Sequence, residues 1–163
     1  MVNSITTIAS GYVNHCDINA FVIANTGLAF DCTTRTLYVA STGDNKIFAV
    51  ANADTITAPG TPATGTVVYS DATHLNGPLH LVIAPNGHLV TSNGDSFTVG
   101  PTAPPPSLLV EFTKTGQFVA QYQIDSVPGA AFGFAFGCGS HCRLLLAAVD
   151  DATNVLKIFV VGC

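Results

Sequence analysis

The stretch that decides the fold is residues 36–50, which read TLYVASTGDNKIFAV. Two short runs rich in β-branched and aromatic residues, 36–42 and 46–50, flank a polar Gly-Asp-Asn cluster. Such residues favour strands, and a Gly/Asp/Asn cluster between two strand-like runs favours a turn. The stretch therefore predicts a β-hairpin.

Similar runs recur along the whole chain, and their spacing is regular. LVTSNGD at 89–95 matches YVASTGD at 38–44, and KIFVV at 157–161 matches KIFAV at 46–50. Strand-like runs occupy residues 27–31, 36–42, 46–50, 66–70, 79–84, 88–92, 108–113, 117–124, 132–137, 143–149 and 155–161. Four short strands in each unit of about 50 residues are typical of a propeller blade.

We therefore expect an all-β fold, a β-propeller segment with three four-stranded blades in one single domain, residues 1–163. Residues 1–26 would form an outer closing strand and a linker. Blade 1 would span 27–76, blade 2 would span 77–130, and blade 3, at 131–163, would lack its outer strand.

Three blades do not close a ring, because propellers have about four to eight. We expect the strand from Ile5 to Cys16 to fill an outer position by strand exchange, pairing with the edge from Val155 to Val161 of a second chain. Two chains would then form a six-bladed ring with C2 symmetry. Two alternatives remain open: blades supplied by residues upstream of this chain, and head-to-tail propagation into a filament.

The hairpin and the run before it carry a family resemblance. GLAFD at 27–31 and TLYVASTGDNKI at 36–47 resemble the NHL-repeat consensus, and GPLHLVIAPNGHLVTSNGD at 77–95 is similar to a later blade of secreted bacterial six-bladed propellers. The resemblance covers residues 27 to about 161 and implies an NHL-like propeller. In those proteins such segments form the C-terminal half of a chain about twice as long.

A more distant resemblance, to the gluconolactonase/SMP-30-like branch, implies a metal site. That branch places an Asn before the first strand of a blade and an Asp after the second strand as metal ligands. Asn25 is similar, but Ser41, Ser92 and Val149 stand at the equivalent Asp positions. The nearby acidic residues are Asp44, Asp95, Asp150 and Asp151, which the alternative interpretation treats as turn residues. We expect no cofactor, and a bound Ca or Zn ion is the alternative.

Five His also raise the question of zinc, but none has the paired spacing of a zinc motif. We instead expect a polar binding face at one end of the blades, open to a protein or carbohydrate ligand. Its members are His74, Asn76, His80, Asn93 and Asp95. His88 follows an Asn-Gly turn and is expected at the opposite end.

The chain has five Cys, an odd number, so at least one is unpaired or pairs with another chain. Cys138 and Cys142 are close enough in sequence for a loop disulfide in an oxidising compartment. Cys16 and Cys163 flank the proposed closing edge and are candidates for an interchain link.

The composition excludes several classes of function. A net charge of -5 with no basic run argues against nucleic acid, and the apolar stretches are too short to span a membrane. Residues 1–10 lack the pattern of a secretory signal, but the low content of charged residues favours a secreted, extracellular protein.

No nucleophile elbow or phosphate loop is present. We expect a non-enzymatic scaffold or binding module that self-associates. The alternative is a metal-assisted lactonase, hydrolase or lyase.

Overall fold

The computed structural model describes residues 5–17, 21–57, 63–93, 106–139 and 143–161. In these ranges the chain forms β-strands, one 3₁₀ turn, η1 (Ala53–Thr55), and no α-helix. The strands are β1 (His15–Asp17), β2 (Phe21–Ile23), β3 (Asn25–Asp31), β4 (Thr36–Ser41), β5 (Lys46–Val50), β6 (Thr66–Tyr69), β7 (Leu81–Ile83), β8 (Leu89–Asn93), β9 (Ser107–Phe112), β10 (Phe118–Asp125), β11 (Ala131–Cys138), β12 (Leu144–Asp150) and β13 (Val155–Val161).

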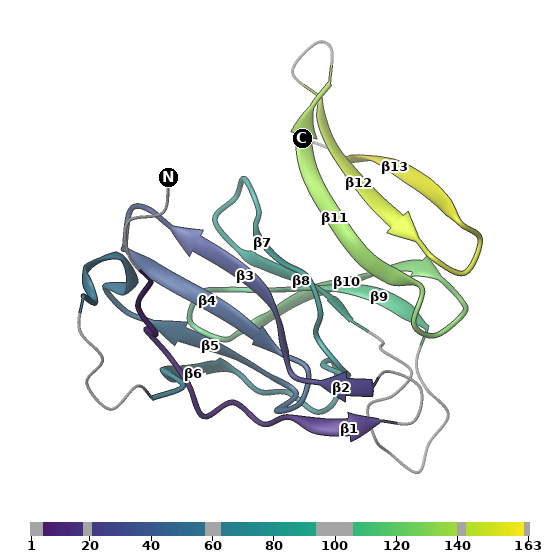
Figure 1. Cartoon of the computed structure of the whole chain (residues 1–163). Coiled ribbons are helices and arrows are strands. Elements are labelled where there is room, and N and C mark those ends of the chain that lie inside the picture. Colours follow the sequence, from purple (N-terminus) through teal and green to yellow (C-terminus); the bar gives the residue numbers. More distant parts are fainter. Residues whose placement is uncertain (1–4, 18–20, 58–62, 94–105, 140–142, 162–163) are drawn as a thin grey trace.

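The strands form three antiparallel sheets in chain order, which is consistent with a propeller-like fold (Figure 1). Sheet 1 has the order β3-β4-β5-β6, sheet 2 the order β7-β8-β9-β10, and sheet 3 the order β11-β12-β13. β1 and β2 form a separate two-stranded sheet. All eleven strand-like runs found in the sequence are confirmed, with ends that differ by at most two residues. The predicted hairpin pairs Val39 with Phe48.

Sheet 2 lies between the other two sheets, and its central strands β8 and β9 are buried throughout. Alternate residues of a strand point to opposite faces, so one strand can serve two cores. On β9, Val110 and Phe112 pack with residues of sheet 1, whereas Leu109 packs with residues of sheet 3. The run at 108–112, which is apolar except for Glu111, reflects this burial on both faces.

The junction between sheets 1 and 2 is close-packed. The rings of Tyr69 on β6 and Phe112 on β9 stack with centroids 4.4 Å apart. A Cβ at Gly27 on β3 would clash with the backbone carbonyl oxygen of Leu79, just before β7. Glycine is therefore required there, because only its missing side chain lets the two segments approach so closely.

The segment from Ile5 to Asn14 does not form the outer strand that the sequence predicts. It runs as irregular chain across one face of sheet 1, where Ile8, Ala9 and Tyr12 cover Phe48 and its buried neighbours. The Tyr12 hydroxyl donates to the Thr64 carbonyl over 2.9 Å, and the Tyr12 ring meets Phe48 edge-on. Only His15 and Cys16 of the predicted strand are in a strand, and that strand, β1, pairs with β2 of the same chain.

One face of sheet 3 has no cover within the described chain. We call it the outer face of sheet 3 and define it by alternate residues of β12 and β13: Leu145, Ala147, Val149, Leu156, Ile158 and Val160. Leu156, Ile158 and Val160 are 64%, 62% and 55% exposed. The opposite face of sheet 3, which carries Leu146 and Ala148, is buried against sheet 2.

Candidate functional site

At the end of the sheets where β4 meets β5, most polar side chains form hydrogen bonds with backbone groups. Asn93 at the end of β8 donates to the His74 carbonyl over 2.7 Å and accepts from the Asn76 amide over 2.6 Å. Asn45 in the β4–β5 turn holds the same loop from the other side, through the Leu75 carbonyl and the Gly77 amide. These amide side chains therefore fix the connection between sheets 1 and 2.

The acidic candidates for a metal site are also engaged in local structure. Asp44 accepts from the Val13 amide at 2.9 Å and the Ser41 hydroxyl at 2.7 Å. Asp150 is fully buried and accepts from the Thr153 hydroxyl and from Lys157. Asn25 begins β3, where its backbone pairs with that of Ser41.

The structure does not assemble these groups into a metal centre. Among the described residues no three His, Cys, Asp or Glu side chains lie together in a way that could hold a metal ion. Asp95 lies outside the described residues. The turn interpretation of Asp44 and Asp150 is the one that their contacts support.

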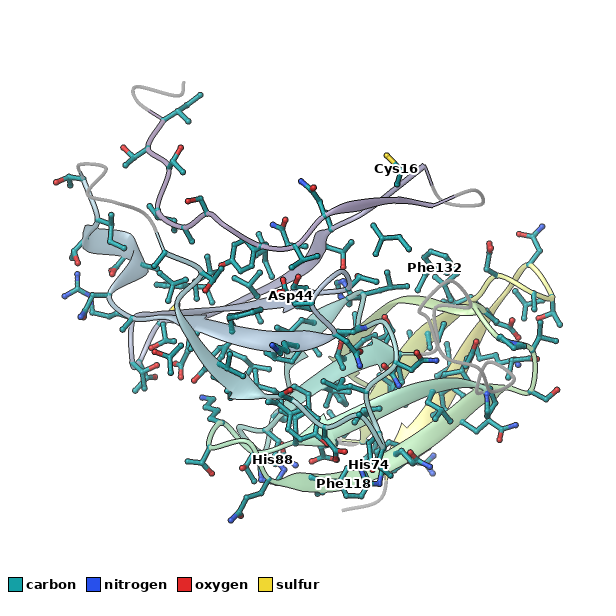
Figure 2. All side chains as sticks on the ribbon, turned by 90° about the horizontal axis from the view of Figure 1, so that it is seen from below. Cys16, Asp44, His74, His88, Phe118 and Phe132 are labelled. Atoms are coloured by element: carbon teal, nitrogen blue, oxygen red, sulfur yellow. The ribbon has the colours of Figure 1, made fainter. Side chains whose placement is uncertain are left out.

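The two His residues expected on one binding face contact different parts of the fold. The His74 ring stacks on Phe118 of β10, the last strand of sheet 2, and its Nδ1 lies 2.6 Å from an Asp71 carboxylate oxygen. The His80 ring stands edge-on to Phe134 of β11, the first strand of sheet 3. Figure 2 shows His74 beside Phe118 and far from Asp44. Asn93 contacts the backbone of His74 and Asn76, and the binding face stays a prediction.

The cysteine predictions fall largely outside the described residues. Cys16, Cys32 and Cys138 are exposed, and none of them forms a disulfide with another described residue. Cys142 and Cys163, the proposed partners of Cys138 and Cys16, are not among the described residues. Both pairings stay predictions.

The structure reveals a cavity that the sequence analysis did not find. It has a volume of about 500 Å³ and lies between sheets 2 and 3, on the side of the β7–β8 turn. Its lining is mainly apolar and comes from both sheets: Ala84, Pro85, Asn86, Val90, Leu109, Glu111, Tyr122, Ile124, Phe136, Leu144, Leu146, Phe159, Val160 and Val161. Cavities that bind small organic molecules have volumes of this order.

Glu111 is the charged group of this cavity, and its side chain is only 10% exposed. One carboxylate oxygen, Oε1, accepts from Asn86 Nδ2 at 2.9 Å and faces His88 Nδ1 at 2.6 Å. The other, Oε2, accepts from the Tyr122 hydroxyl at 3.1 Å. Burial alone raises the pKa of Glu111, but the hydrogen bonds from Asn86, His88 and Tyr122 outweigh it and lower the pKa below its usual value. A carboxylate with this pKa is ionised at neutral pH.

A sequence signal for this site existed. Glu111 is the only Glu in the chain, and it interrupts an apolar strand, LLVEF at 108–112. A charge in a strand buried on both faces needs a partner. His88 and Asn86 stand in the turn before the neighbouring strand β8, and only the register of β8 on β9, Val90 opposite Glu111, brings them to it.

The comparisons with known proteins agree with the fold. No protein-family model and no curated protein matches the sequence. Several solved structures are similar, two enzymes among them. One is a luciferin-regenerating enzyme, at 14% identity and a TM-score of 0.54, covering 94% of this chain and 52% of that one. The other is a gluconolactonase from Xanthomonas campestris, at 19% identity and a TM-score of 0.48, covering 87% of this chain and 40% of that one.

At these identities the likeness shows the fold alone. It supports a propeller-like fold and does not distinguish the NHL type from other propellers. This chain spans about half the length of the solved structures that it matches. No helix in the described part of the chain is long and apolar enough to cross a bilayer.

Proposed function

We propose that this chain is a self-associating module of an NHL-type β-propeller, working outside the cell as a scaffold. The observation that carries the proposal is the outer face of sheet 3. Sheets 1 and 2 bury their facing residues against each other, as do sheets 2 and 3, whereas Leu156, Ile158 and Val160 face solvent. A contiguous apolar face of this kind is typical of a protein interface.

A second copy of the chain is the partner that we propose for this face. A second copy carries the same apolar face, so the two surfaces match in chemistry. β13 is also an edge strand, paired only with β12 in the described sheets, and its free side offers unpaired backbone groups. Two-fold packing of one outer face on another buries both apolar surfaces and needs no change in either chain.

Strand exchange through Ile5 to Cys16 is a different route to the same partner. It would require this segment to leave sheet 1 and expose Phe48 and Val50, which Ile8 and Tyr12 now help to cover. A chain from which this segment has been deleted therefore distinguishes strand exchange from direct packing. Exchange needs the segment, and direct packing of sheet 3 does not.

Native mass, measured by sedimentation over a range of concentrations, tests the proposal. We expect the wild-type chain to dimerise and Ile158→Lys, with a charge at the centre of the outer face, to be monomeric. Val119→Lys is the matched control, since Val119 is also exposed but lies on β10 of sheet 2. A chain without residues 1–13 should still dimerise. Equal masses for wild type and Ile158→Lys would refute the proposed interface.

An enzymatic function is a second candidate, favoured by the fold that the chain shares with the luciferin-regenerating enzyme. The activity would be that of a metal-assisted lactonase, hydrolase or lyase in a completed ring. Purified protein would then contain stoichiometric Ca²⁺ or Zn²⁺, lost on chelation together with hydrolysis of a lactone. Metal-free protein without such activity would contradict this candidate.

A further inference from the structure

The cavity between sheets 2 and 3 combines an apolar body with one polar wall. Val90 and Leu109 of sheet 2 face Leu146 and Phe159 of sheet 3 across it. Asn86, Glu111 and Tyr122 form the polar wall on the sheet 2 side. An apolar cavity with a few convergent polar groups is the usual form of a small-molecule site, because the apolar lining supplies affinity and the polar groups fix orientation.

The hydrogen bonds of Glu111 leave room for a further donor. A carboxylate has about four lone-pair positions on its two oxygens. The contacts with Asn86 and His88 occupy Oε1, and the Tyr122 hydroxyl is the one donor to Oε2 in the described structure. Oε2 therefore has one lone-pair position left for another donor, and Glu111 is a lining residue of the cavity.

We propose that this cavity binds a small apolar amine, with its ammonium group on Glu111 and its apolar body between sheets 2 and 3. Glu111 is anionic and nearly buried, and all five Lys and Arg side chains of the chain are absent from the lining. An ammonium group supplies both the donor and the opposite charge, and charge-assisted hydrogen bonds are about twice as strong as neutral ones. An anionic head group would be repelled by the same carboxylate. Glu111 itself lies on sheet 2, away from the outer face of sheet 3, although Val160 belongs to that face and also lines the cavity.

Three probes with one apolar chain and different head groups test this assignment: octylamine, octanol and octanoate. Binding is measured by calorimetry on the full chain, below the concentration at which the probes form micelles. Octylamine should bind at least about tenfold more tightly than octanol, as a charged hydrogen bond implies. Octanoate should bind most weakly. Equal affinity for the three, or no binding of any, would overturn the proposal.

Two variants locate the binding. Glu111→Gln keeps the shape and removes the charge, so the preference for octylamine should fall about tenfold while octanol binding changes little. Asp54→Asn is the matched control, since it removes an exposed carboxylate from η1. Equal losses in the two variants would refute the site.

Leu144→Phe keeps the test decisive if Glu111→Gln does not fold. Leu144 lies at the start of β12, is half-buried, and lines the cavity. A larger side chain there narrows the cavity, so all three probes should bind several-fold more weakly. Unchanged affinities would place the binding elsewhere and overturn the proposal.

Discussion

At the scale of single residues, Asp71 shows how one carboxylate fixes a connection. It follows β6, accepts from the Tyr69 hydroxyl and the Thr73 amide, and faces His74 Nδ1. The hydrogen bond from His74 is the largest cause that lowers the pKa of Asp71 to about 2; partial burial opposes this shift. The carboxylate therefore favours the folded chain only while it is ionised.

This shift predicts an acid-dependent stability. A pKa below the unfolded value of about 3.9 adds stability above that pH, and the contribution is lost as pH falls from about 4 to about 2. Asp71→Asn should flatten this part of the profile, measured as urea midpoints by circular dichroism from pH 5 to pH 2. Asp54→Asn is the control. Parallel profiles for wild type and Asp71→Asn would contradict the prediction.

At the scale of elements, the segment from Ile5 to Asn14 acts as a cover for sheet 1. Tyr12 anchors it through its contact with Phe48, at 5.3 Å between ring centroids, and its bond to Thr64. Burial of Tyr12 raises the pKa of its hydroxyl, so the bond persists through the physiological range.

Tyr12→Ala should release this segment. We expect a loss of about 1 to 2 kcal/mol in the free energy of unfolding, from an edge-on aromatic pair and one hydrogen bond. Hydrogen exchange at residues 5–14 should also accelerate, while exchange in sheet 3 stays unchanged. Ile5→Ala is the control because Ile5 is 91% exposed. Unaltered exchange at 5–14 in Tyr12→Ala would show that the ring does not anchor the segment.

At the scale of the whole molecule, two lysines connect neighbouring sheets. Lys114, after β9, reaches Asp31 at the end of β3, at 2.6 Å. Lys157 on β13 contacts the Ile124 carbonyl and Asp125 of sheet 2, together with Asp150 of its own sheet. The side-chain hydrogen bond from Lys157 holds the pKa of Asp150 well below its usual range, so the ion pair is formed at neutral pH.

Lys157→Met should therefore loosen sheet 3 from sheet 2. The variant leaves the Asp150 carboxylate buried without its cation, which is the costly way to break an ion pair. We expect a lower urea midpoint and faster hydrogen exchange in β11 to β13 than in sheet 1. Lys46→Met, on β5, is the control for loss of one lysine. Similar midpoints for the two variants would show that the Lys157 contacts do not hold the sheets together.

The sequence by itself determined the strands, their antiparallel pairing in chain order and the division into three sheets. These features depend on local propensity and turn chemistry, as in TLYVASTGDNKIFAV. Such signals are local and do not depend on contacts between distant residues. The sequence also indicated the turn roles of Asp44 and Asp150.

Only the tertiary structure decided where Ile5 to Asn14 lies, that the rings of His74 and His80 contact different sheets, and that Glu111 meets His88 beside a cavity. The N-terminal segment has residues that favour a strand. Its place is set instead by the burial of Ile8 and Tyr12 against the apolar face of sheet 1, which local propensity does not reveal. Glu111 and His88 are 23 positions apart, and strand register joins them. Contacts between distant parts of a chain are set by packing, which no short stretch of sequence contains.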